Sequence, residues 1–577
     1  MKALIQIENL HYRPGTLPAD APDILCGINL SINKGDFIAI VGKNGSGKTT
    51  LIKHINGLLL PTRGRVLVDG IDTRLDENRP KLQIMVGMVF QNPADQIVAS
   101  TVEEDVAFGL ENLNLHTTDI RVRVAERLSA VGLTDQATRP PHLLSGGQIQ
   151  KVALAGVLAR QPRVILFDEP TSMLDPQTRS AFMVHLQELH RSGMTIIYIT
   201  HHMEETVFAD QVVVMDAGKI AYSGPPKEIY WDKHNLYEFG LDKPEAVRLA
   251  EKFISFGWKF DQPILSPEDL MCALPNYSGN RKQKINEQDG LADDLNIPLI
   301  QMKDVHYTYL SGSPLAQKAL NGVYFCVPKG QLHAIAGANG SGKSTLLQHI
   351  IGILRPESGK IRVGEFLIEN AQTSLKEVIR KVGLVFQSPE TQFFEVFVGD
   401  EIAYGPKQFM MEGLREHVSQ AMLMVGLDFV AFKDRRLETL SGGEKRKVAL
   451  ASTLVLDQEI LLFDEPTAGM DPHARDDILK LFKTLQDQGK TIIIASHRME
   501  ELAHVADHLS LMQSGVVIHT GVLNSVIANI SAIQNAGLMP PLSVQVAQSL
   551  VDKGWPLNVK DAVTPDQLFS AIQEVHP

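Results

Sequence analysis

Two glycine-rich segments of this chain have the residue types and spacing that suit phosphate binding. Residues 42–50 read GKNGSGKTT and residues 337–345 read GANGSGKST. Glycines let backbone N–H groups converge on phosphate oxygens, and the N-terminus of the following helix adds a favourable dipole. The lysine of the pattern is expected to pair with the β- and γ-phosphates of a nucleotide, and the next hydroxyl with Mg²⁺. These residues are Lys48 and Lys343, followed by Thr49 and Ser344.

An acid pair follows an apolar run in each half, within the repeated string LFDEPT at 166–171 and 462–467. The aspartates, Asp168 and Asp464, are placed to hold Mg²⁺ directly or through water. The glutamates, Glu169 and Glu465, are placed to polarise an attacking water as general bases. Alone, such an acid is more often a helix cap or a surface group; its recurrence beside Pro-Thr favours a catalytic role.

A histidine and a glutamine accompany each acid pair. His201 and His497 each end an apolar run 32 residues after the glutamate, where the ring can contact a γ-phosphate and hold the attacking water. His202 is the competitor of His201, but the second half has Arg498 at that place. Gln91 and Gln387 follow Val-Phe, and their amides can ligate Mg²⁺ or hydrogen-bond the water. The alternative for them is an ordinary loop glutamine.

A second glycine pattern in each half starts a helical stretch and offers another anion-binding helix N-terminus. The residues are Ser145, Gly146 and Gly147 in the first half and Ser441, Gly442 and Gly443 in the second. Within its own half the pattern is surplus, because the phosphate loop already holds the phosphates. This redundancy favours a role in covering nucleotide that is bound to the other half.

The motifs recur at offsets of 295 or 296 residues, which indicates a tandem duplication. A Gly-Trp pair recurs too, at Gly257 and Gly554, so each half has a core and a small tail. The expected domains are a first ATPase domain (1–224), its C-terminal subdomain (225–274), a polar linker (275–296), a second ATPase domain (297–521) and its C-terminal subdomain (522–577). An ordered polar loop is the alternative for 275–296.

Composition limits the class of protein. The 577 residues are 44% hydrophobic and 21% charged, with a net charge of −12, which disfavours a nucleic-acid-binding surface. The three cysteines, Cys26, Cys272 and Cys326, make a cysteine metal site improbable and fit a reducing cytosol. No apolar run is long enough to span a bilayer, and the N-terminus does not resemble a signal peptide. We expect a cytosolic protein that serves a membrane, if at all, through a partner.

Short apolar strands alternate with helices around these motifs. Strands are expected at 37–41, 164–167 and 195–199, and helices at 49–57 and 148–158. This alternation predicts an α/β fold with a mostly parallel sheet, whose ligands bind at the carboxyl ends of the strands.

The order of phosphate loop, glutamine, LSGG, acid pair and histidine resembles the ATP-binding cassette (ABC) family, and the resemblance covers both halves outside the linker. It implies tandem P-loop NTPase domains, ATP and Mg²⁺ as ligands, and two composite sites formed head-to-tail. Each site would join one half's phosphate loop to the other half's LSGG. Asp175 and Asp471 match the loop that links the sites.

The candidate residues are then the following. Catalytic candidates are Glu169, Glu465, His201, His497, Gln91 and Gln387. Nucleotide-binding candidates in the first half are Tyr12, Gly42, Lys43, Asn44, Gly45, Ser46, Gly47, Lys48, Thr49, Thr50, Ser145, Gly146 and Gly147. Those in the second half are Tyr309, Gly337, Ala338, Asn339, Gly340, Ser341, Gly342, Lys343, Ser344, Thr345, Ser441, Gly442 and Gly443. Metal candidates are Thr49, Gln91, Asp168, Ser344, Gln387 and Asp464.

Departures from the family pattern are few. Glu444 replaces the glutamine after LSGG, a variant that leaves the serine and glycines intact. Tyr309 is a clear candidate to stack on adenine, whereas Tyr12 could equally have a packing role. Because both halves keep the glutamate and the histidine, both sites are expected to hydrolyse ATP.

Residues 89–112 and 385–407 resemble the ATPases of energy-coupling-factor (ECF) importers, which bring vitamins or transition-metal ions into prokaryotic cells. The resemblance implies a transmembrane coupling protein and a substrate-specific membrane protein in trans, no nucleic-acid partner, and a peripheral position at the cytoplasmic face of the membrane. Asp95 and Glu390 are the acids expected to grip the coupling helices, with an ordinary solvated acid as the alternative. A sugar or peptide importer ATPase and a ribosomal twin-cassette translation factor are the other hypotheses.

Overall fold

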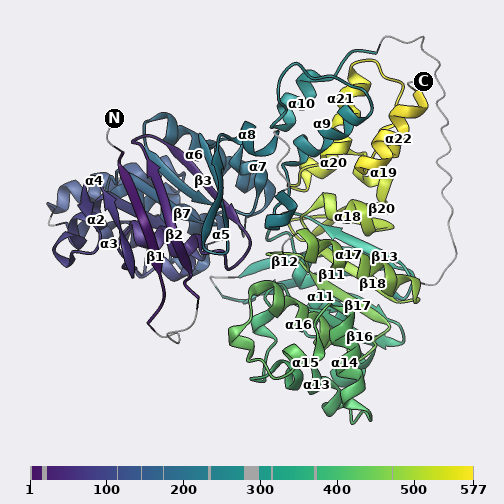
Figure 1. The fold of residues 1–577 in the computed structure, drawn as a ribbon. Helices are drawn as coiled ribbons and strands as arrows, with labels where there is room; N and C mark the ends of the chain where they lie inside the picture. The colour runs from purple at the N-terminus through teal and green to yellow at the C-terminus, as the bar shows by residue number, and fades with distance from the viewer. Residues whose placement is uncertain are drawn as a thin grey trace. The chain divides into compact units, whose positions relative to one another are not determined.

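The computed structural model describes residues 3–15, 22–113, 115–144, 146–172, 174–231, 236–277, 298–313, 316–369, 373–470 and 472–575. The chain forms two compact units, one of residues 1–174 and 178–270, the other of 175–177 and 271–577 (Figure 1). The described part of the expected linker ends at Tyr277; most of 275–296 lies outside the described residues.

Each unit contains a six-stranded sheet that carries the chemistry. In the first unit the strand order is β10-β9-β3-β8-β7-β6, and in the second it is β16-β17-β18-β13-β19-β20. All neighbours pair in parallel except the last hairpin of each, β9–β10 and β19–β20. The predicted α/β class and mostly parallel sheet are confirmed. Most residues of its central strands are apolar and buried, as expected for a parallel sheet that is covered on both faces.

A second, antiparallel sheet of four strands accompanies each parallel one, in the order β2-β1-β4-β5 and β12-β11-β14-β15. Sequence analysis missed it. Its strands bury one face only; β4 (Arg63–Val68), for example, buries Val66 and Val68 and leaves Arg63 and Arg65 exposed. Together with the inner face of the parallel sheet this sheet encloses a core that includes Ile5, Ile40 and Leu51.

The strands and helices of the first unit have the following bounds. The strands are β1 (Ile5–Tyr12), β2 (Leu25–Ile32), β3 (Phe37–Gly42), β4 (Arg63–Val68), β5 (Ile71–Asp72), β6 (Val86–Val89), β7 (Val164–Asp168), β8 (Thr195–Ile199), β9 (Gln211–Asp216) and β10 (Lys219–Gly224). The helices are α1 (Lys48–Ile55), α2 (Arg79–Met85), α3 (Val102–Glu111), α4 (Thr117–Ala130), α5 (Gly146–Ala159), α6 (Pro176–Arg191), α7 (Met203–Thr206), α8 (Pro226–Tyr230), α9 (Glu245–Ser255) and α10 (Pro267–Ala273).

The second unit repeats the order of the strands, and two short 3-10 turns of the first unit are replaced by helices. Its strands are β11 (Ile300–Tyr309), β12 (Gln317–Val327), β13 (Leu332–Ala336), β14 (Ser358–Val363), β15 (Phe366–Leu367), β16 (Val382–Val385), β17 (Ile460–Asp464), β18 (Thr491–Ser496), β19 (His508–Gln513) and β20 (Val516–Val522). Its helices are α11 (Lys343–Ile351), α12 (Leu375–Lys381), α13 (Val398–Gln408), α14 (Leu414–Met424), α15 (Phe429–Phe432), α16 (Gly442–Leu454), α17 (Pro472–Asp487), α18 (Met499–Val505), α19 (Leu523–Ile527), α20 (Ile530–Asn535), α21 (Leu542–Asp552) and α22 (Pro565–Val575).

The C-terminal part of the second unit is a small helical body that also holds the start of the polar segment. Lys553 Nζ donates to the carbonyl oxygens of Met271 and Leu274, at 2.7 and 2.6 Å. The indole N–H of Trp555 donates to the carbonyl of Pro275 at 3.0 Å. Trp555, the tryptophan of the second Gly-Trp pair, is 4% exposed and thus fixes the start of the polar segment to this helical body.

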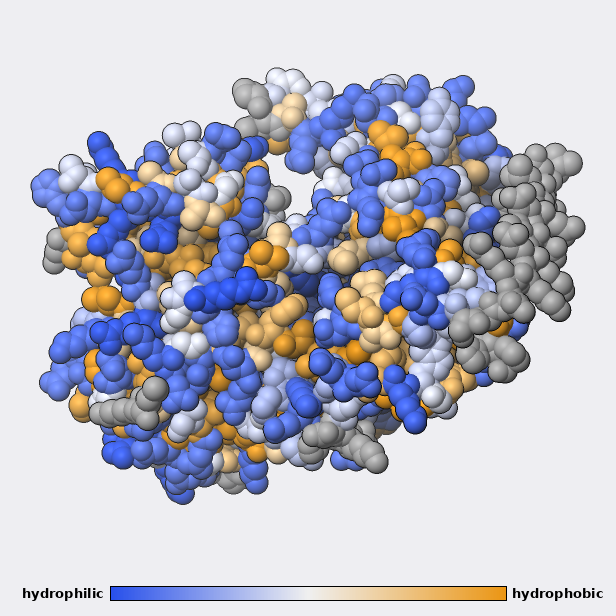
Figure 2. All heavy atoms as spheres, turned by 90° about the horizontal axis from the view of Figure 1, so that it is seen from above, coloured by the Kyte–Doolittle hydropathy of each residue, from blue (hydrophilic) through white to orange (hydrophobic). Residues whose placement is uncertain are grey.

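No helix among the described residues is long and apolar enough to cross a membrane. On the face drawn in Figure 2, hydrophilic side chains predominate and hydrophobic ones occur in small groups.

Candidate functional site

The phosphate loop of the second unit connects β13 to α11. Gly342 precedes the helix with φ of 106°, a backbone conformation that favours glycine. The side chain of Lys343 is 5% exposed, and its Nζ donates to the carbonyls of Gly337 and Ala338 at 2.6 and 3.0 Å. Burial lowers the pKa of Lys343, although the charges of Glu465 and Asp464 oppose the shift. The ammonium is therefore held over the loop, where a phosphate would meet it.

The first unit has the same loop between β3 and α1. Lys48 Nζ donates to the carbonyls of Gly42 and Lys43 at 2.8 and 3.0 Å. A Cβ on Gly42 would lie 2.2 Å from the carbonyl oxygen of Met215, so only glycine fits there. Helix α1 begins at Lys48 and ends at Ile55, two residues before the predicted end at Gly57.

The acid pairs lie at the carboxyl ends of β7 and β17, next to these loops. Thr49 Oγ1 donates to Asp168 Oδ1 at 2.9 Å. Burial raises the pKa of Asp464 to about 6, although the hydrogen bond from Ser344 opposes the shift. Oδ1 of Asp464 is buried without a hydrogen-bond partner in the described part of the chain. A buried oxygen of this kind, beside a hydroxyl and a phosphate loop, suits the oxygen-rich coordination that Mg²⁺ requires.

Each glutamate forms a short ion pair with the predicted histidine. His201 Nε2 lies 2.5 Å from Glu169 Oε1, and His497 Nδ1 lies 2.7 Å from Glu465 Oε1. Burial by itself would raise the pKa of each glutamate. The histidine's hydrogen bond and charge outweigh burial, so the pKa of Glu169 and of Glu465 is lowered. Both carboxylates are therefore ionised near neutral pH, as a general base must be.

Both glutamates have the same unusual backbone. Glu169 has φ of 47° and Glu465 has φ of 48°, in the left-handed region that side chains other than glycine, asparagine and aspartate rarely adopt. Each backbone N–H donates to the neighbouring strand, to Ile199 or Ala495, at 3.0 and 2.9 Å. Such strain persists where the surroundings hold it, and it directs these carboxylates toward the phosphate loops.

The two glutamines are placed differently. Gln91 Nε2 donates to Glu169 Oε2 at 3.0 Å. In the second unit the corresponding oxygen of Glu465 accepts instead from Ser496 Oγ, at 3.4 Å. Gln387 is exposed and lines the pocket. Sequence analysis assigned both glutamines to Mg²⁺ or to the attacking water and did not predict the hydrogen bond from Gln91 to Glu169.

A pocket of about 350 Å³ joins these groups in the second unit. It is lined by Tyr309, Gln317, Lys318, Ala319, Asn339, Gly340, Ser341, Gly342, Lys343, Ser344, Thr345, Gln387, Asp464 and Glu465. The phosphate loop, the acid pair and a tyrosine thus border one space. This arrangement suits a nucleoside triphosphate with its base near the tyrosine and its phosphates over the loop.

The tyrosines show which aromatic can reach that pocket. Tyr309 lines it, and its hydroxyl lies 3.2 Å from Thr345 Oγ1. Tyr12 corresponds in strand register to Tyr307, because each pairs with a leucine of the neighbouring strand. The ring of Tyr12 packs edge-on against His54, as Tyr307 packs against His349. Stacking of Tyr12 on adenine stays a prediction, and the packing alternative describes its present contacts.

The LSGG segments precede long helices, α5 and α16. Ser441 caps α16: its Oγ accepts from the N–H of Glu444 at 3.3 Å, and the carboxylate of Glu444 accepts from the N–H of Ser441 at 2.8 Å. Glu444 is thus a capping residue, consistent with a tolerated replacement of glutamine. Ser145 and Asp471 lie outside the described residues. Gly146 and Gly147 are the first two residues of α5.

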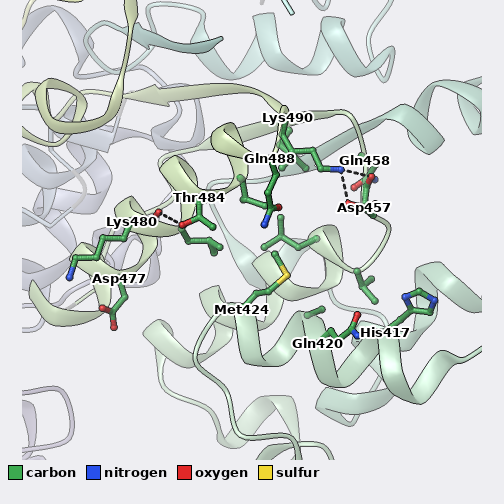
Figure 3. A pocket seen from close by; sticks show the side chains of 16 residues that line it. His417, Gln420, Met424, Asp457, Gln458, Asp477, Lys480, Thr484, Gln488 and Lys490 are labelled. Atoms are coloured by element: carbon green, nitrogen blue, oxygen red, sulfur yellow. Dashed lines mark hydrogen bonds and ion pairs between the residues drawn. The ribbon is translucent and has the colours of Figure 1, made fainter. Parts of the chain in front are cut away.

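A larger pocket of about 590 Å³ lies away from the phosphate loop, among α14, α16 and α17 (Figure 3). Lys490 bonds the side chain of Asp457 at its edge, at 2.6 Å. His417 and Lys480 also line it. None of the predicted site residues borders this pocket.

Comparisons with known proteins agree with this geometry. The ABC transporter family profile matches residues 25–172 and 320–468. A protein of Methanosarcina mazei named as an ABC transporter ATP-binding protein is 31% identical, over 95% of this chain and 94% of its own length. One of Bacillus thuringiensis subsp. konkukian with the same designation is 35% identical, over 85% and 87%.

Two solved structures resemble one half of the chain. CbiO1 from Clostridium perfringens, described as part of the ABC transporter complex CbiONQ, is 37% identical; it covers 44% of this chain and 100% of its own, with a TM-score of 0.38. The ATP-binding cassette MJ0796, a dimer bound to ADP and Pi, is 30% identical over 38% and 98%, with a TM-score of 0.36.

Proposed function

Since the chain belongs to the ABC transporter family, as two ATPase cassettes in one polypeptide that bind and hydrolyse ATP, we propose that it is the energy-coupling subunit of a prokaryotic importer. ATP binding closes the two cassettes head-to-tail, and hydrolysis with phosphate release reopens them. A rigid-body change of this kind needs only a higher affinity for ATP in the closed state. The observation that carries the proposal is the repeated ion pair of an ionised glutamate and a histidine beside each phosphate loop.

Residues of each cassette supply the chemistry. Lys48 and Lys343 neutralise phosphate charge, and the ionised glutamate accepts the proton of the attacking water. The paired histidine keeps that carboxylate ionised and oriented. Mg²⁺, when bound by the hydroxyl after the loop lysine and by the aspartate that ends the neighbouring strand, would stabilise negative charge on the transferred phosphoryl group.

The base assignment has a direct test. A Glu169→Gln/Glu465→Gln chain keeps the shape of both sites but lacks a proton acceptor, so ATP turnover should fall at least a hundredfold while ATP binding is retained. Steady-state phosphate release and equilibrium ATP binding measure the two quantities. As a matched control, Glu444→Gln changes a half-buried glutamate of the same unit, which does not border the pocket, and should leave turnover within twofold. Steady hydrolysis by the double variant would contradict the assignment.

An apolar groove next to the Gln91 loop supports a membrane partner. It measures about 380 Å³ and lies among α2, α3 and α5. Ile84, Val98 and Phe108 line it, with exposures of 42%, 64% and 51%. Arg160 also lines it and donates to the carbonyl of Gln83 at 3.2 Å. Apolar side chains rarely stay exposed together without a function in binding.

The second unit exposes aromatic residues at the same positions, 296 residues later. Phe394 corresponds to Val98 and is 76% exposed; Tyr404 corresponds to Phe108 and is 37% exposed. Their rings stack at 5.5 Å. The occupant proposed for the groove of the first unit and for the exposed aromatic residues of the second is an amphipathic cytoplasmic helix of a transmembrane coupling protein, because a loop beside the catalytic glutamate can then sense it.

The acids expected to grip that helix differ between the halves. Both Glu390 and Asp95 are exposed, and Glu390 pairs with Lys445 at 3.2 Å. The 296-residue offset places Glu390 opposite Ala94 and Asp95 opposite Thr391, so the acids differ by one position. A shared gripping role for them stays a prediction.

The partner can be tested by purification. A tagged chain should co-purify with a transmembrane protein from detergent-solubilised membranes of its own organism. Phe108→Asp/Phe394→Asp should lose that protein, because a charge then replaces an exposed apolar ring in each unit. Tyr324→Asp, at a 64%-exposed tyrosine of β12, is the matched control and should keep it. ATP turnover in detergent should be equal in all three. Recovery of ribosomes instead would favour the translation-factor hypothesis.

The ECF subfamily, with a vitamin or transition-metal ion as cargo, is our preferred importer class, and the motif strings at 89–112 and 385–407 support it. Another ABC importer class, for a sugar or peptide, is the alternative. The protein would then lie at the cytoplasmic face of the membrane through its partners. Identification of the co-purified membrane protein would distinguish these classes.

A further inference from the structure

One buried arginine ties together two parts of the second site. Arg446 lies on α16 and is 6% exposed. Its NH1 donates to the carbonyl oxygen of Glu465 at 2.7 Å, and its NH2 donates to that of Gln387 at 2.7 Å. A single planar guanidinium therefore joins the residue at the end of β17 to the loop after β16. Because arginine presents its donors in a rigid fork, it fixes both carbonyls in one geometry.

The proposed reaction needs Glu465 and the loop of Gln387 to keep a fixed position relative to each other. The side chain of Glu465 is held by His497 and Ser496, and its backbone has φ of 48°. Arg446 holds the carbonyl of that strained residue. The loop of Gln387 leads along the chain to Phe394, which is 76% exposed. A displacement of that loop is thus transmitted to the glutamate through the arginine.

Among the described residues of the first unit, no side chain is found to make the same pair of bonds. The position equivalent to Arg446 is Gln150, which is 3% exposed. The side-chain nitrogen of Gln150 is buried and has no hydrogen-bond partner among the described residues. There the link between loop and glutamate is instead the side chain of Gln91, which donates to Glu169 Oε2 at 3.0 Å. In the second unit the arginine side chain joins two backbone carbonyls. In the first unit the glutamine side chain joins its loop to the carboxylate of the glutamate.

We propose that Arg446 is a positioning residue that couples the Gln387 loop to Glu465, and that the two ATP sites of this chain are therefore not equivalent. The inference rests on the proposed role of Glu465 as a general base. It goes beyond that role because the sequence motifs, which recur in both halves, do not distinguish the two sites. In the Lys343 site, the loop of Gln387 and the base Glu465 therefore move together. The Lys48 site can release its loop from Glu169 when Gln91 turns toward a nucleotide.

Amide hydrogen exchange tests the tether without reference to activity. In the full chain, Arg446→Gln introduces the residue of the first half and should speed exchange of the peptide covering 386–392 at least threefold. The peptide covering 90–96 of the same molecule is the internal control and should not change. The reciprocal Gln150→Arg should slow exchange at 90–96. Unchanged exchange at 386–392 would overturn the proposal.

Kinetics then test whether the tether serves catalysis. Arg446→Gln should lower kcat for ATP about twofold, the largest loss expected when one of two independent sites slows, and leave KM within twofold. Arg446→Lys, which keeps the charge and can reach one carbonyl, should give an intermediate kcat. Lys447→Gln removes a neighbouring charge of the same helix and should leave kcat unchanged. Faster exchange with an unchanged kcat would overturn the positioning role.

The test separates this inference from the proposed function. If Glu465 is not the base, the Glu169→Gln/Glu465→Gln chain hydrolyses ATP, while the exchange difference between Arg446→Gln and the parent chain persists. If the tether is absent, the double variant is inactive as expected and the exchange rates do not respond to residue 446.

Discussion

Individual residues show how the duplicated halves have diverged although they contain the same series of motifs. His333 of β13 is 2% exposed, and its Nε2 lies 2.8 Å from Ser510 Oγ. Burial, with the neighbouring charge of His508, lowers the pKa of His333 to about 3, although Asp507 opposes the shift. The equivalent strand position in the first unit is Ile38, which cannot titrate. The second unit alone therefore has this ionisable group in the centre of its sheet.

This burial predicts an acid-sensitive second unit. The folded-state pKa lies below the unfolded value of about 6.5, so the neutral ring contributes stability above pH 6.5 that is lost as the pH falls toward 3. At pH 5 the loss amounts to about 2 kcal/mol. His333→Ile, which imports the residue of the first unit, should lose less stability between pH 7.5 and pH 5 than the parent chain. Unfolding midpoints at both pH values measure this difference; equal losses would refute it.

Each phosphate loop is positioned by the strand and helix that flank it and by a contact from the C-terminal part of its own half. The parallel strands β3 and β13 deliver the chain to the loop, and helices α1 and α11 begin immediately after it. The tail of each half provides the second contact. Lys43 Nζ donates to the carbonyl of Glu238 at 2.7 Å, and the N–H of Ala338 donates to that of Ala536 at 3.1 Å. In each half, a residue that follows the parallel sheet thus contacts the second residue of the phosphate loop.

This contact predicts that a small change in the tail weakens nucleotide binding. A Cβ on Gly537, whose φ is 76°, would lie 2.9 Å from Ala338 Cβ. Gly537→Ala should therefore displace the loop and reduce its ATP affinity about threefold or more, measured by equilibrium binding in a Lys48→Ala chain. Gly489→Ala carries the same backbone strain, with φ of 86° and no atom within 4 Å, and should bind as the parent does. Equal affinities of the two variants would contradict a role of the tail.

At the scale of the whole molecule, the proposed head-to-tail pairing assigns each LSGG to the other half's nucleotide. In the second unit Ser441 is exposed and caps α16, where its N–H and hydroxyl both bond the carboxylate of Glu444. Within its own unit it is not among the residues that border the Lys343 pocket. This separation favours a partner from the other cassette.

The pairing predicts a crossed effect. Ser441→Arg should block the nucleotide held by Lys48, because the larger side chain would fill the space beside its γ-phosphate. Photolabelling with an azido-ATP, followed by peptide mapping, should show labelling of residues 1–224 reduced several-fold and that of 297–521 retained. The control Glu444→Gln should leave both halves labelled. Loss of label confined to 297–521 would refute the head-to-tail arrangement.

The sequence by itself determined the duplication, the α/β class and the groups that gather at each phosphate loop, because those groups follow from motifs whose backbone geometry is local. Glycine loops and strand-ending acids specify their own conformation, and parallel strands bring their carboxyl ends together. The antiparallel sheets and the tail contact on the phosphate loop required the tertiary structure, because they depend on packing between segments far apart in the chain. So did the divergence of the two sites: Gln150 and Arg446 are unremarkable in sequence, and only burial beside two carbonyls gives the arginine its role.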